Sequence, residues 1–330
     1  MPPPNPSRAI LRQRGVARLT TPIPWAQAGP VNSYVLRGPP HVVIDTGYAF
    51  AWPELSAQLA AEDIQLGDIA AILLTHGHPD HASGASELVP RSGAAVHLHP
   101  QDHPKLAPDY LEVKAQQYQR LRPWFRREGV PDREFDAYVA RFEAPRHRFE
   151  FDLRPESLAD GQRLELPTGP LTVLATPGHT PGHVLFHDEE RRLAFSGDHL
   201  LAETSPNPLL DFDEDDRRYR SFPDYLSSLA RVRGLDVDLW CPGHGRAISA
   251  APPVIDSLHE FYGVRQAALV ECAGEQGATS FELSRALFPD ASGLDRFLSL
   301  SETVGHVDAL VERRVLTPQM RDGRRVLLPR

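Results

Sequence analysis

The segment at residues 72–84, ILLTHGHPDHASG, places four side chains that could do chemistry directly after a run of apolar residues. His76, His78, Asp80 and His81 fall within six positions. Imidazole and carboxylate groups are costly to bury without partners. Two interpretations therefore compete: a solvated turn after a buried strand, or a site that binds a metal ion.

Histidine or aspartate also follows four other apolar segments. HVVI precedes Asp45, LTVLAT precedes Pro-Gly-His179, RLAFS precedes Gly-Asp198, and DVDLWC precedes Pro-Gly-His244. Most of these steps pass through a glycine, which permits a tight turn. In α/β sheets, ligand sites form at the carboxyl ends of the strands. Five such strand ends in one chain favour a shared site over five separate solvated turns.

The number of donors bears on how many ions such a site could hold. Seven of these side chains offer a nitrogen or oxygen: His76, His78, Asp80, His81, His179, Asp198 and His244. One zinc ion uses three or four protein ligands, whereas two ions that share a bridging carboxylate use all seven. No cysteine is expected as a ligand, which distinguishes the set from a closed structural site. Imidazole and carboxylate ligands with room for water indicate a catalytic site.

The surrounding sequence predicts the α/β layers that would position these residues. Up to about residue 100, the patterns predict a hairpin over NSYVLRG and HVVIDTG, a helix over WPELSAQLAAED, and strands over AAILLT and AAVHLH. Residues 101–150 interrupt this pattern with two or three helices. Their aromatic residues are interpreted as core packing or, alternatively, as a wall over the site. Strands resume at about residue 162 and continue to DVDLWC.

The end of the chain differs in kind. A long helix over about 253–273 leads to helices over SFELSRALF and ETVGHVDALVERRV, then to two short strands around Asp322-Gly323. Helices followed by a hairpin are similar to a winged-helix module. We therefore predict a flexible N-terminus at 1–14, a catalytic domain at 15–250 with a helical insertion at about 101–150, and a linker helix with a winged-helix-like domain at 251–330.

Composition sets limits on the partners. The chain has 330 residues, 41% of them hydrophobic and 24% charged, as in soluble globular proteins. A net charge of −9 argues against a protein that mainly coats nucleic acid. Cys241 and Cys272 form no disulfide framework, and no signal peptide or bilayer-spanning segment is evident, so we expect a cytoplasmic protein with no membrane partner. Cys241, at the end of an apolar segment, is expected to pack as a small apolar residue.

Taken together, these motifs resemble those of the metallo-β-lactamase superfamily. The resemblance rests on VIDTG around Asp45, HGHPDH at 76–81, TPGHT around His179, SGD around Asp198 and PGHG around His244. It covers about residues 15–250 and implies a four-layer αββα sandwich. It further implies two ligand sets: His76, His78 and His179 for the first metal ion, and Asp80, His81 and His244 for the second, with Asp198 bridging the two. Asp45 would steady the loops of the metal site without binding an ion itself. His183, which is close to the ligands in the sequence, is a further candidate for this role.

The resemblance also implies a mechanism. A hydroxide held between two dications is a nucleophile at neutral pH, because coordination lowers the pKa of water to about 7. One ion would polarise the carbonyl or phosphoryl oxygen, and the other would stabilise the leaving group. Asp80 would orient the nucleophile and carry its proton besides ligating. Zinc is the first choice for both ions, although histidine and carboxylate also accept iron and manganese.

Departures from known branches of the superfamily narrow the expected substrate. True β-lactamases do not usually keep an aspartate at the position of Asp198, and a site with this aspartate is similar to glyoxalase II-like thioesterases and lactonases. GDHLL at 197–201 departs from the glyoxalase II pattern, which argues against a glutathione thioester. The layout with an insertion and a winged-helix tail resembles a branch in which some members cleave single-stranded RNA.

Three hypotheses follow for the activity. The leading one is hydrolysis of an ester or thioester of a small molecule, the second is cleavage of RNA phosphodiesters, and the third is a nucleic-acid-binding metal sensor. The complete ligand set argues against the sensor. Residues 281–330 carry eight arginines against seven acidic residues, which argues against both nucleic-acid hypotheses despite a small patch at Arg321, Arg324 and Arg325. We expect the tail to be structural or to form a dimer contact, so a homodimer is compatible with the sequence.

Overall fold

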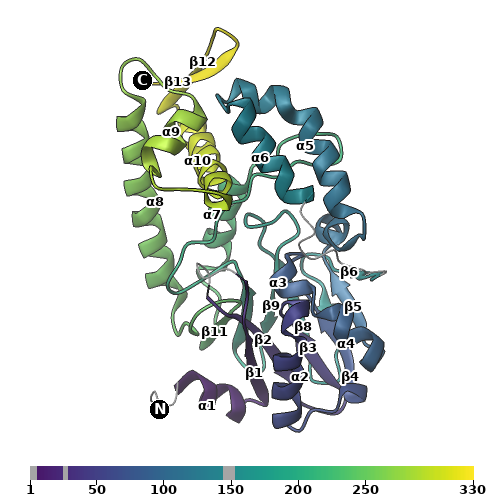
Figure 1. The fold of residues 1–330 in the computed structure, drawn as a ribbon. Helices are drawn as coiled ribbons and strands as arrows, with labels where there is room; N and C mark the ends of the chain where they lie inside the picture. The colour runs from purple at the N-terminus through teal and green to yellow at the C-terminus, as the bar shows by residue number, and fades with distance from the viewer. Residues whose placement is uncertain (1–5, 25–28, 144–152) are drawn as a thin grey trace. The chain divides into compact units, whose positions relative to one another are not determined.

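The computed structural model describes residues 6–24, 29–143 and 153–330. The chain divides into two compact units, whose elements are drawn in Figure 1. Unit 1 comprises Met1–Pro108, Phe149–Pro206 and Ser228–Ile255, and unit 2 comprises Asp109–Arg148, Asn207–Ser227 and Asp256–Arg330. The predicted insertion is therefore grouped with the C-terminal segment rather than with the unit that carries the motifs.

Unit 1 contains a six-stranded mixed sheet in the order β1-β2-β3-β4-β5-β6. Its strands are β1 (Val16–Thr21), β2 (Val31–Leu36), β3 (His41–Ile44), β4 (Ile69–Leu73), β5 (Ala95–Leu98) and β6 (Glu156–Ser157). The predicted hairpin is confirmed as the antiparallel pair β2–β3, and β3 to β6 run parallel. Because Ile44 pairs with Leu73, Asp45 and the segment that follows β4 leave the sheet at the same edge.

A second sheet of unit 1 has five strands in the order β11-β10-β9-β8-β7. They are β7 (Arg163–Leu164), β8 (Leu171–Ala175), β9 (Val184–Asp188), β10 (Leu193–Gly197) and β11 (Leu239–Pro242). Strands β10 and β11 are parallel, and β9 is antiparallel to both β8 and β10. It follows that β8, β10 and β11 point in the same direction, so the segments with His179, Asp198 and His244 all begin at one edge.

The core of unit 1 explains why these residues form layers. One apolar cluster combines residues of both sheets, including Leu73, Phe186, Phe195 and the fully buried Cys241. A second cluster joins the other face of the first sheet to helices α2 (Trp52–Ala61) and α4 (Ala85–Ser92). The two clusters establish helix, sheet and sheet as successive layers of an α/β fold, and they confirm the apolar role predicted for Cys241.

Residues 6–13, part of the N-terminus that we predicted to be flexible, form a helix. Helix α1 spans Pro6–Gln13, and Leu11 is fully buried in the cluster between the sheets. The guanidinium of Arg12 forms an ion pair with Glu62 at 2.7 Å. The prolines and arginines of this segment predicted a loose chain, but the tertiary burial of Leu11 and the pairing of Arg12 hold the helix in place. Residues 1–5 lie outside the described part.

Unit 2 is mainly helical. It contains α5 (Tyr110–Arg127), α6 (Asp132–Glu143), α9 (Ser280–Leu287), α10 (Leu294–Glu312) and a hairpin of β12 (Leu316–Arg321) and β13 (Arg324–Pro329). Helices α7 (Ser221–Val232) and α8 (Ala251–Ala273) each cross between the two units. None of the helices in the described ranges combines the length and apolar character that a bilayer-spanning segment needs.

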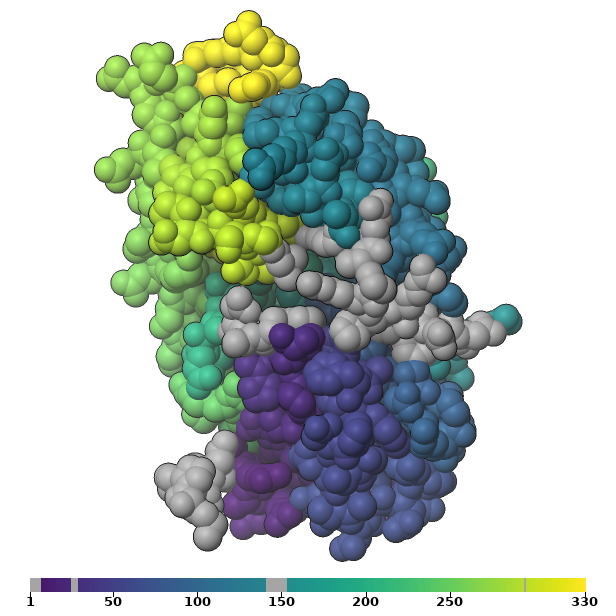
Figure 2. Space-filling model, in the orientation of Figure 1, coloured from purple at the N-terminus to yellow at the C-terminus, as the bar shows by residue number. Residues whose placement is uncertain are grey.

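The aromatic residues of the insertion pack in the core of unit 2. Tyr118, Phe125 and Phe135 cluster with Phe297 and Leu300 of α10. Figure 2 shows the surface formed by the insertion in blue and teal beside the C-terminal segment in green and yellow. Core packing is therefore the role of these aromatic side chains, as the first of the two interpretations predicted.

A close backbone approach gives a testable consequence of this fold. The amide of Gly84 donates to the Gly47 carbonyl at 2.9 Å, and a Cβ at Gly84 would lie 2.1 Å from the Thr46 oxygen. We expect Gly84→Ala to lower the free energy of unfolding by about 1–3 kcal/mol, because the added methyl group has no space. Gly67→Ala is the control, since a Cβ there meets nothing within 4 Å. Denaturant titration compares the two, and equal stability would contradict the close approach.

Candidate metal centre

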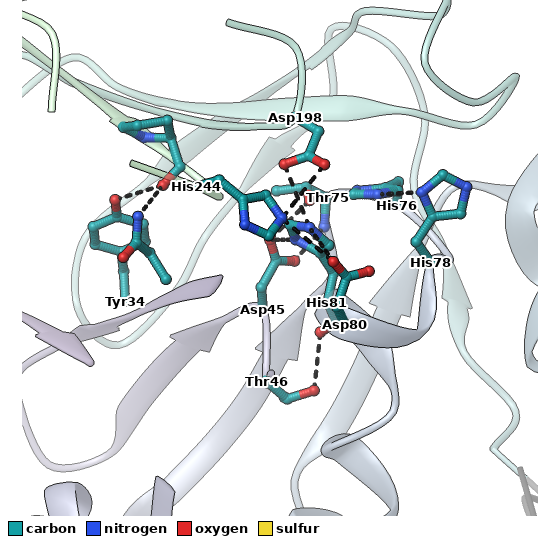
Figure 3. Close-up of polar contacts among 12 residues, drawn as sticks. Tyr34, Asp45, Thr46, Thr75, His76, His78, Asp80, His81, Asp198 and His244 are labelled. Carbon is teal, nitrogen blue, oxygen red and sulfur yellow. Dashed lines mark hydrogen bonds and ion pairs between the residues drawn. The ribbon is translucent and has the colours of Figure 1, made fainter. Parts of the chain in front are cut away.

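The seven predicted donors converge at one edge of the two sheets of unit 1. They form three overlapping groups in which the candidate ligand atoms lie within 4.8 Å of one another. The first group is His76, His78 and His179, and the second group is Asp80, His81 and His244. A third set, His76, His81 and Asp198, overlaps both. Figure 3 shows most of these side chains directed toward one another from the ends of separate strands. The structure therefore brings together all the residues that the motifs singled out as donors.

The first group consists of three imidazoles. His76 Nε2 lies 3.0 Å from His78 Nδ1, and His179 Nε2 lies 2.9 Å from the same atom. His76 and His78 follow β4, whereas His179 follows β8 in the other sheet. Three ring nitrogens that face one another so closely are an arrangement suited to a cation between them.

The second group combines a carboxylate with two imidazoles. Asp80 Oδ2 lies 3.3 Å from His244 Nε2 and 3.9 Å from His81 Nε2. Asp80 and His81 belong to the short helix α3 (Pro79–Ala82), which starts directly after His78. A single turn of helix thus carries two donors of the second group, directly after His78 of the first group.

Asp198 lies between the two groups. Its Oδ2 is 3.5 Å from His179 Nε2 of the first group and 3.7 Å from His244 Nε2 of the second. Its Oδ1 is 3.4 Å from His81 Nε2. Of the two carboxylates among the seven donors, Asp198 is the one that lies within 4 Å of imidazoles of both groups.

The polar atoms of this cluster fit a divalent cation. His81 Nε2, His244 Nε2 and Asp198 Oδ1 are buried without a hydrogen-bond partner among the described residues. A buried polar atom left in this state costs about 1–3 kcal/mol. Nitrogen and oxygen donors at these positions match what Zn²⁺, Fe²⁺ and Mn²⁺ accept. Coordination would satisfy all three atoms at once.

Neighbouring groups orient the imidazoles of the second group. The Nδ1 of His81 is 2.8 Å from Asp45 Oδ2, and Asp45 also accepts hydrogen bonds from the Thr75 amide and hydroxyl, each at 2.8 Å. The Nδ1 of His244 is 3.2 Å from the Pro30 carbonyl oxygen, which can only accept. With its proton on Nδ1, each ring directs the Nε2 lone pair into the cluster.

His183 supports the bridging position. Its Nε2 accepts a hydrogen bond from the backbone amide of Asp198 at 3.2 Å, and its Nδ1 lies 2.8 Å from the Thr176 hydroxyl. A Cβ at Gly197 would lie 2.9 Å from this Nε2, so the absence of a side chain permits the contact. His183 thus contacts the main chain of the candidate ligand Asp198 and belongs to none of the three donor groups.

A sequence profile described as the "Metallo-beta-lactamase superfamily" matches residues 26–244. The chain belongs to this superfamily.

Three proteins of known name or structure are similar to this chain. It is 30% identical over 309 residues to "Probable metallo-hydrolase YqjP" of Bacillus subtilis, covering 92% of this chain and 94% of that one. It is 23% identical over 294 residues to "Atrochrysone carboxyl ACP thioesterase" of Aspergillus fumigatus, covering 88% and 73%. A crystal structure of a metallo-beta-lactamase family protein from Thermus thermophilus is similar with a TM-score of 0.78 and 28% identity, covering 96% and 99%.

Burial and charge divide the imidazoles of the superfamily site into two kinds. Burial, together with the neighbouring imidazoles, lowers the pKa of His76 well below its usual value and that of His78 to about 3. Burial alone would also lower the pKa of His81 and His244, but the carboxylates of Asp198 and Asp80 outweigh it and raise both pKa values. Since an imidazole ligates only when neutral, protonation would compete with a cation more strongly at His81 and His244 than at His76 and His78.

Several supporting residues were not predicted. Thr75 and Thr176 stand inside the quoted motifs and Pro30 outside them, and their roles appear only in the hydrogen bonds that they make to Asp45, His183 and His244. Asp102, fully buried between two of the ligand segments, was missed as well. Its partners on the ligand segments lie 25 to 80 positions away in sequence, so no local pattern could reveal that it contacts them.

Metal removal should destabilise this superfamily member. We expect chelation of the Zn²⁺-loaded protein to lower Tm by roughly 5–15 °C, because a tightly bound ion adds several kcal/mol to the folded state. Differential scanning calorimetry before and after dialysis against a chelator measures the shift. Zn²⁺ should restore Tm, and Mg²⁺ should not, since it prefers an octahedral set of oxygen ligands. An unchanged Tm after proven metal removal would contradict the assignment of a metal centre.

Proposed function

We propose that this superfamily member hydrolyses an ester or thioester bond of a small molecule with two divalent metal ions, of which zinc is the first choice. The observation that carries the proposal is the convergence of seven donors, two groups of three with Asp198 between them. The relative named as an ACP thioesterase supports the class of bond, although it is only 23% identical.

The side chains of the site would divide the work among them. When bound, the ions supply a water that is activated at neutral pH and positive charge for the carbonyl oxygen. Asp198 and the five imidazoles would bind the ions, and Asp45 keeps the Nε2 lone pair of His81 directed toward the other donors. Asp80, with Oδ2 3.3 Å from His244 Nε2, would accept a hydrogen bond from the attacking water and take up its proton.

The small arginine patch of the hairpin, Arg321, Arg324 and Arg325, has one neutralised member. The guanidinium of Arg325 lies 3.2 Å from the carboxylate of Glu128, which is almost completely buried. Arg321 donates a hydrogen bond to the Gln276 carbonyl at 2.7 Å. Because electrostatic contacts to phosphates dominate such binding, a patch with one neutralised member favours a small-molecule substrate over RNA.

The bond class is tested with a panel of substrates for the Zn²⁺-loaded protein. We expect turnover of p-nitrophenyl esters or acyl-coenzyme A thioesters by the wild type, abolished in Asp198→Ala, and no cutting of end-labelled single-stranded RNA. Release of p-nitrophenol or free thiol is followed by absorbance. RNA cutting by the wild type but not by Asp198→Ala would overturn the proposed bond class.

The ligand assignment has its own test. His78→Ala and Asp198→Ala should each lose at least one metal equivalent per chain. Their activity should fall by more than the roughly 10- to 100-fold loss that follows when a residue that only supports a ligand is replaced. His97→Ala is the matched control, because His97 pairs with Glu156 at 3.5 Å and belongs to none of the three donor groups. Inductively coupled plasma mass spectrometry gives the metal content. Full metal content and activity in either ligand variant would refute its assignment.

A further inference from the structure

Asp102 is a fully buried carboxylate that none of the roles above uses. It lies in a 3₁₀ helix, η3 (Pro100–Leu106), which follows β5 at the same edge of the sheet as the metal centre. A charged carboxylate is costly to bury unless it is paired and hydrogen-bonded. The partners that satisfy Asp102 therefore indicate what it does.

Asp102 Oδ2 joins two segments that carry ligands of the first group. It accepts a hydrogen bond from the Gly77 amide at 2.9 Å and another from the Thr180 hydroxyl at 2.6 Å. Gly77 stands between His76 and His78, and Thr180 directly follows His179. One oxygen atom thus contacts the chain beside all three imidazoles of the first group.

Asp102 Oδ1 completes the connection. It accepts a hydrogen bond from the Gly182 amide at 3.2 Å and from the ammonium of Lys105 at 2.8 Å. Lys105 lies one turn further along η3 and is itself buried. The carboxylate therefore has four donors, three of them on the two ligand segments, and a cation that balances its charge.

Two glycines allow this close approach. A Cβ at Gly182 would lie 2.8 Å from Asp102 Cγ, and a Cβ at Gly77 would lie 2.9 Å from Lys105 Cβ. Side chains at either position would push η3 away from the ligand segments. Glycine at both contacts therefore allows the Asp102 carboxylate to reach the ligand segments directly.

We propose that Asp102 is a positioning residue for the first metal ion: it fixes the segment of His76 and His78 to the segment of His179 and so sets the spacing of the three imidazoles. Asp45 has the corresponding role for the second group through His81. Asp45 also accepts hydrogen bonds from Thr75, which precedes His76, whereas only Asp102 joins the segment of His76 and His78 to the segment of His179. This inference rests on the metal centre of the proposed function, but not on the identity of the substrate.

The chemistry of the partners defines the variants. All four partners of Asp102 donate to it, so Asp102→Asn keeps the shape but replaces one acceptor oxygen with an amide NH2 group, and of the four partners only the Thr180 hydroxyl can accept. Thr180→Val removes a single hydrogen bond and is a milder change, used in case Asp102→Asn does not fold. Asp188→Asn is the matched control: Asp188 is also fully buried in unit 1 and also paired with a cation three residues later, Arg191 at 2.8 Å, but contacts no ligand segment.

Binding of Co²⁺ to the metal-free full-length protein separates positioning from a merely structural role. For the wild type we expect two equivalents per chain. For Asp102→Asn we expect a roughly 10- to 100-fold weaker affinity for one equivalent, with changed ligand-field absorption bands for that ion and the other unaffected. Thr180→Val should show the same change at smaller size. Asp188→Asn should lower Tm but leave both Co²⁺ affinities and the spectrum as in the wild type.

Each outcome is decisive for one of the two proposals. Wild-type Co²⁺ affinity and spectrum in Asp102→Asn, or in Thr180→Val if the first variant does not fold, would overturn the positioning role even if Tm falls. A wild type that binds no Co²⁺ would overturn the positioning role together with the metal centre. If the wild type binds two equivalents but hydrolyses no ester or thioester, only the proposed function fails, because the Co²⁺ measurements need no substrate.

Discussion

The candidate metal centre of unit 1 depends on the crowding of seven polar groups whose nitrogen and oxygen atoms are only partly satisfied by one another. Imidazole nitrogens face each other at 2.9–3.0 Å in the first group, and the carboxylates of Asp80 and Asp198 both lie within 3.7 Å of His244 Nε2. Several of these atoms are buried without a hydrogen-bond partner in the described part of the chain. An unpaired buried polar atom is costly, and cations between the groups would satisfy these atoms.

The fold produces this crowding by simple means. Strands of both sheets end at one edge, and short turns there deliver one or a few donors each. Apolar residues between the sheets fix the strands, so the turns need little length of their own. What remains is the orientation of the rings, which buried carboxylates and carbonyls behind the donors provide. Stability therefore lies in the apolar layers, and specificity for an ion lies in the turns.

The sequence predicted what local patterns encode. Apolar runs that end in His76, His179, Asp198 and His244 were sufficient for the strands and for their convergence, because parallel strands share an edge. Helix α1 and the two-residue strand β6 escaped notice, since burial of Leu11 and pairing with β5 are tertiary effects. Asp102 was missed for the same reason: its hydrogen-bond partners come together only when the chain folds.

The grouping of the insertion with the C-terminal segment also lay beyond sequence patterns. Helical spacing placed Phe125 on one apolar face and Phe135 on another, but did not show that α10 would cover both.

The most direct test of a two-ion centre in unit 1 is the number of zinc ions bound per chain after loading and removal of free metal. The account predicts two, held on either side of Asp198. A value of one or zero in correctly folded protein would contradict it.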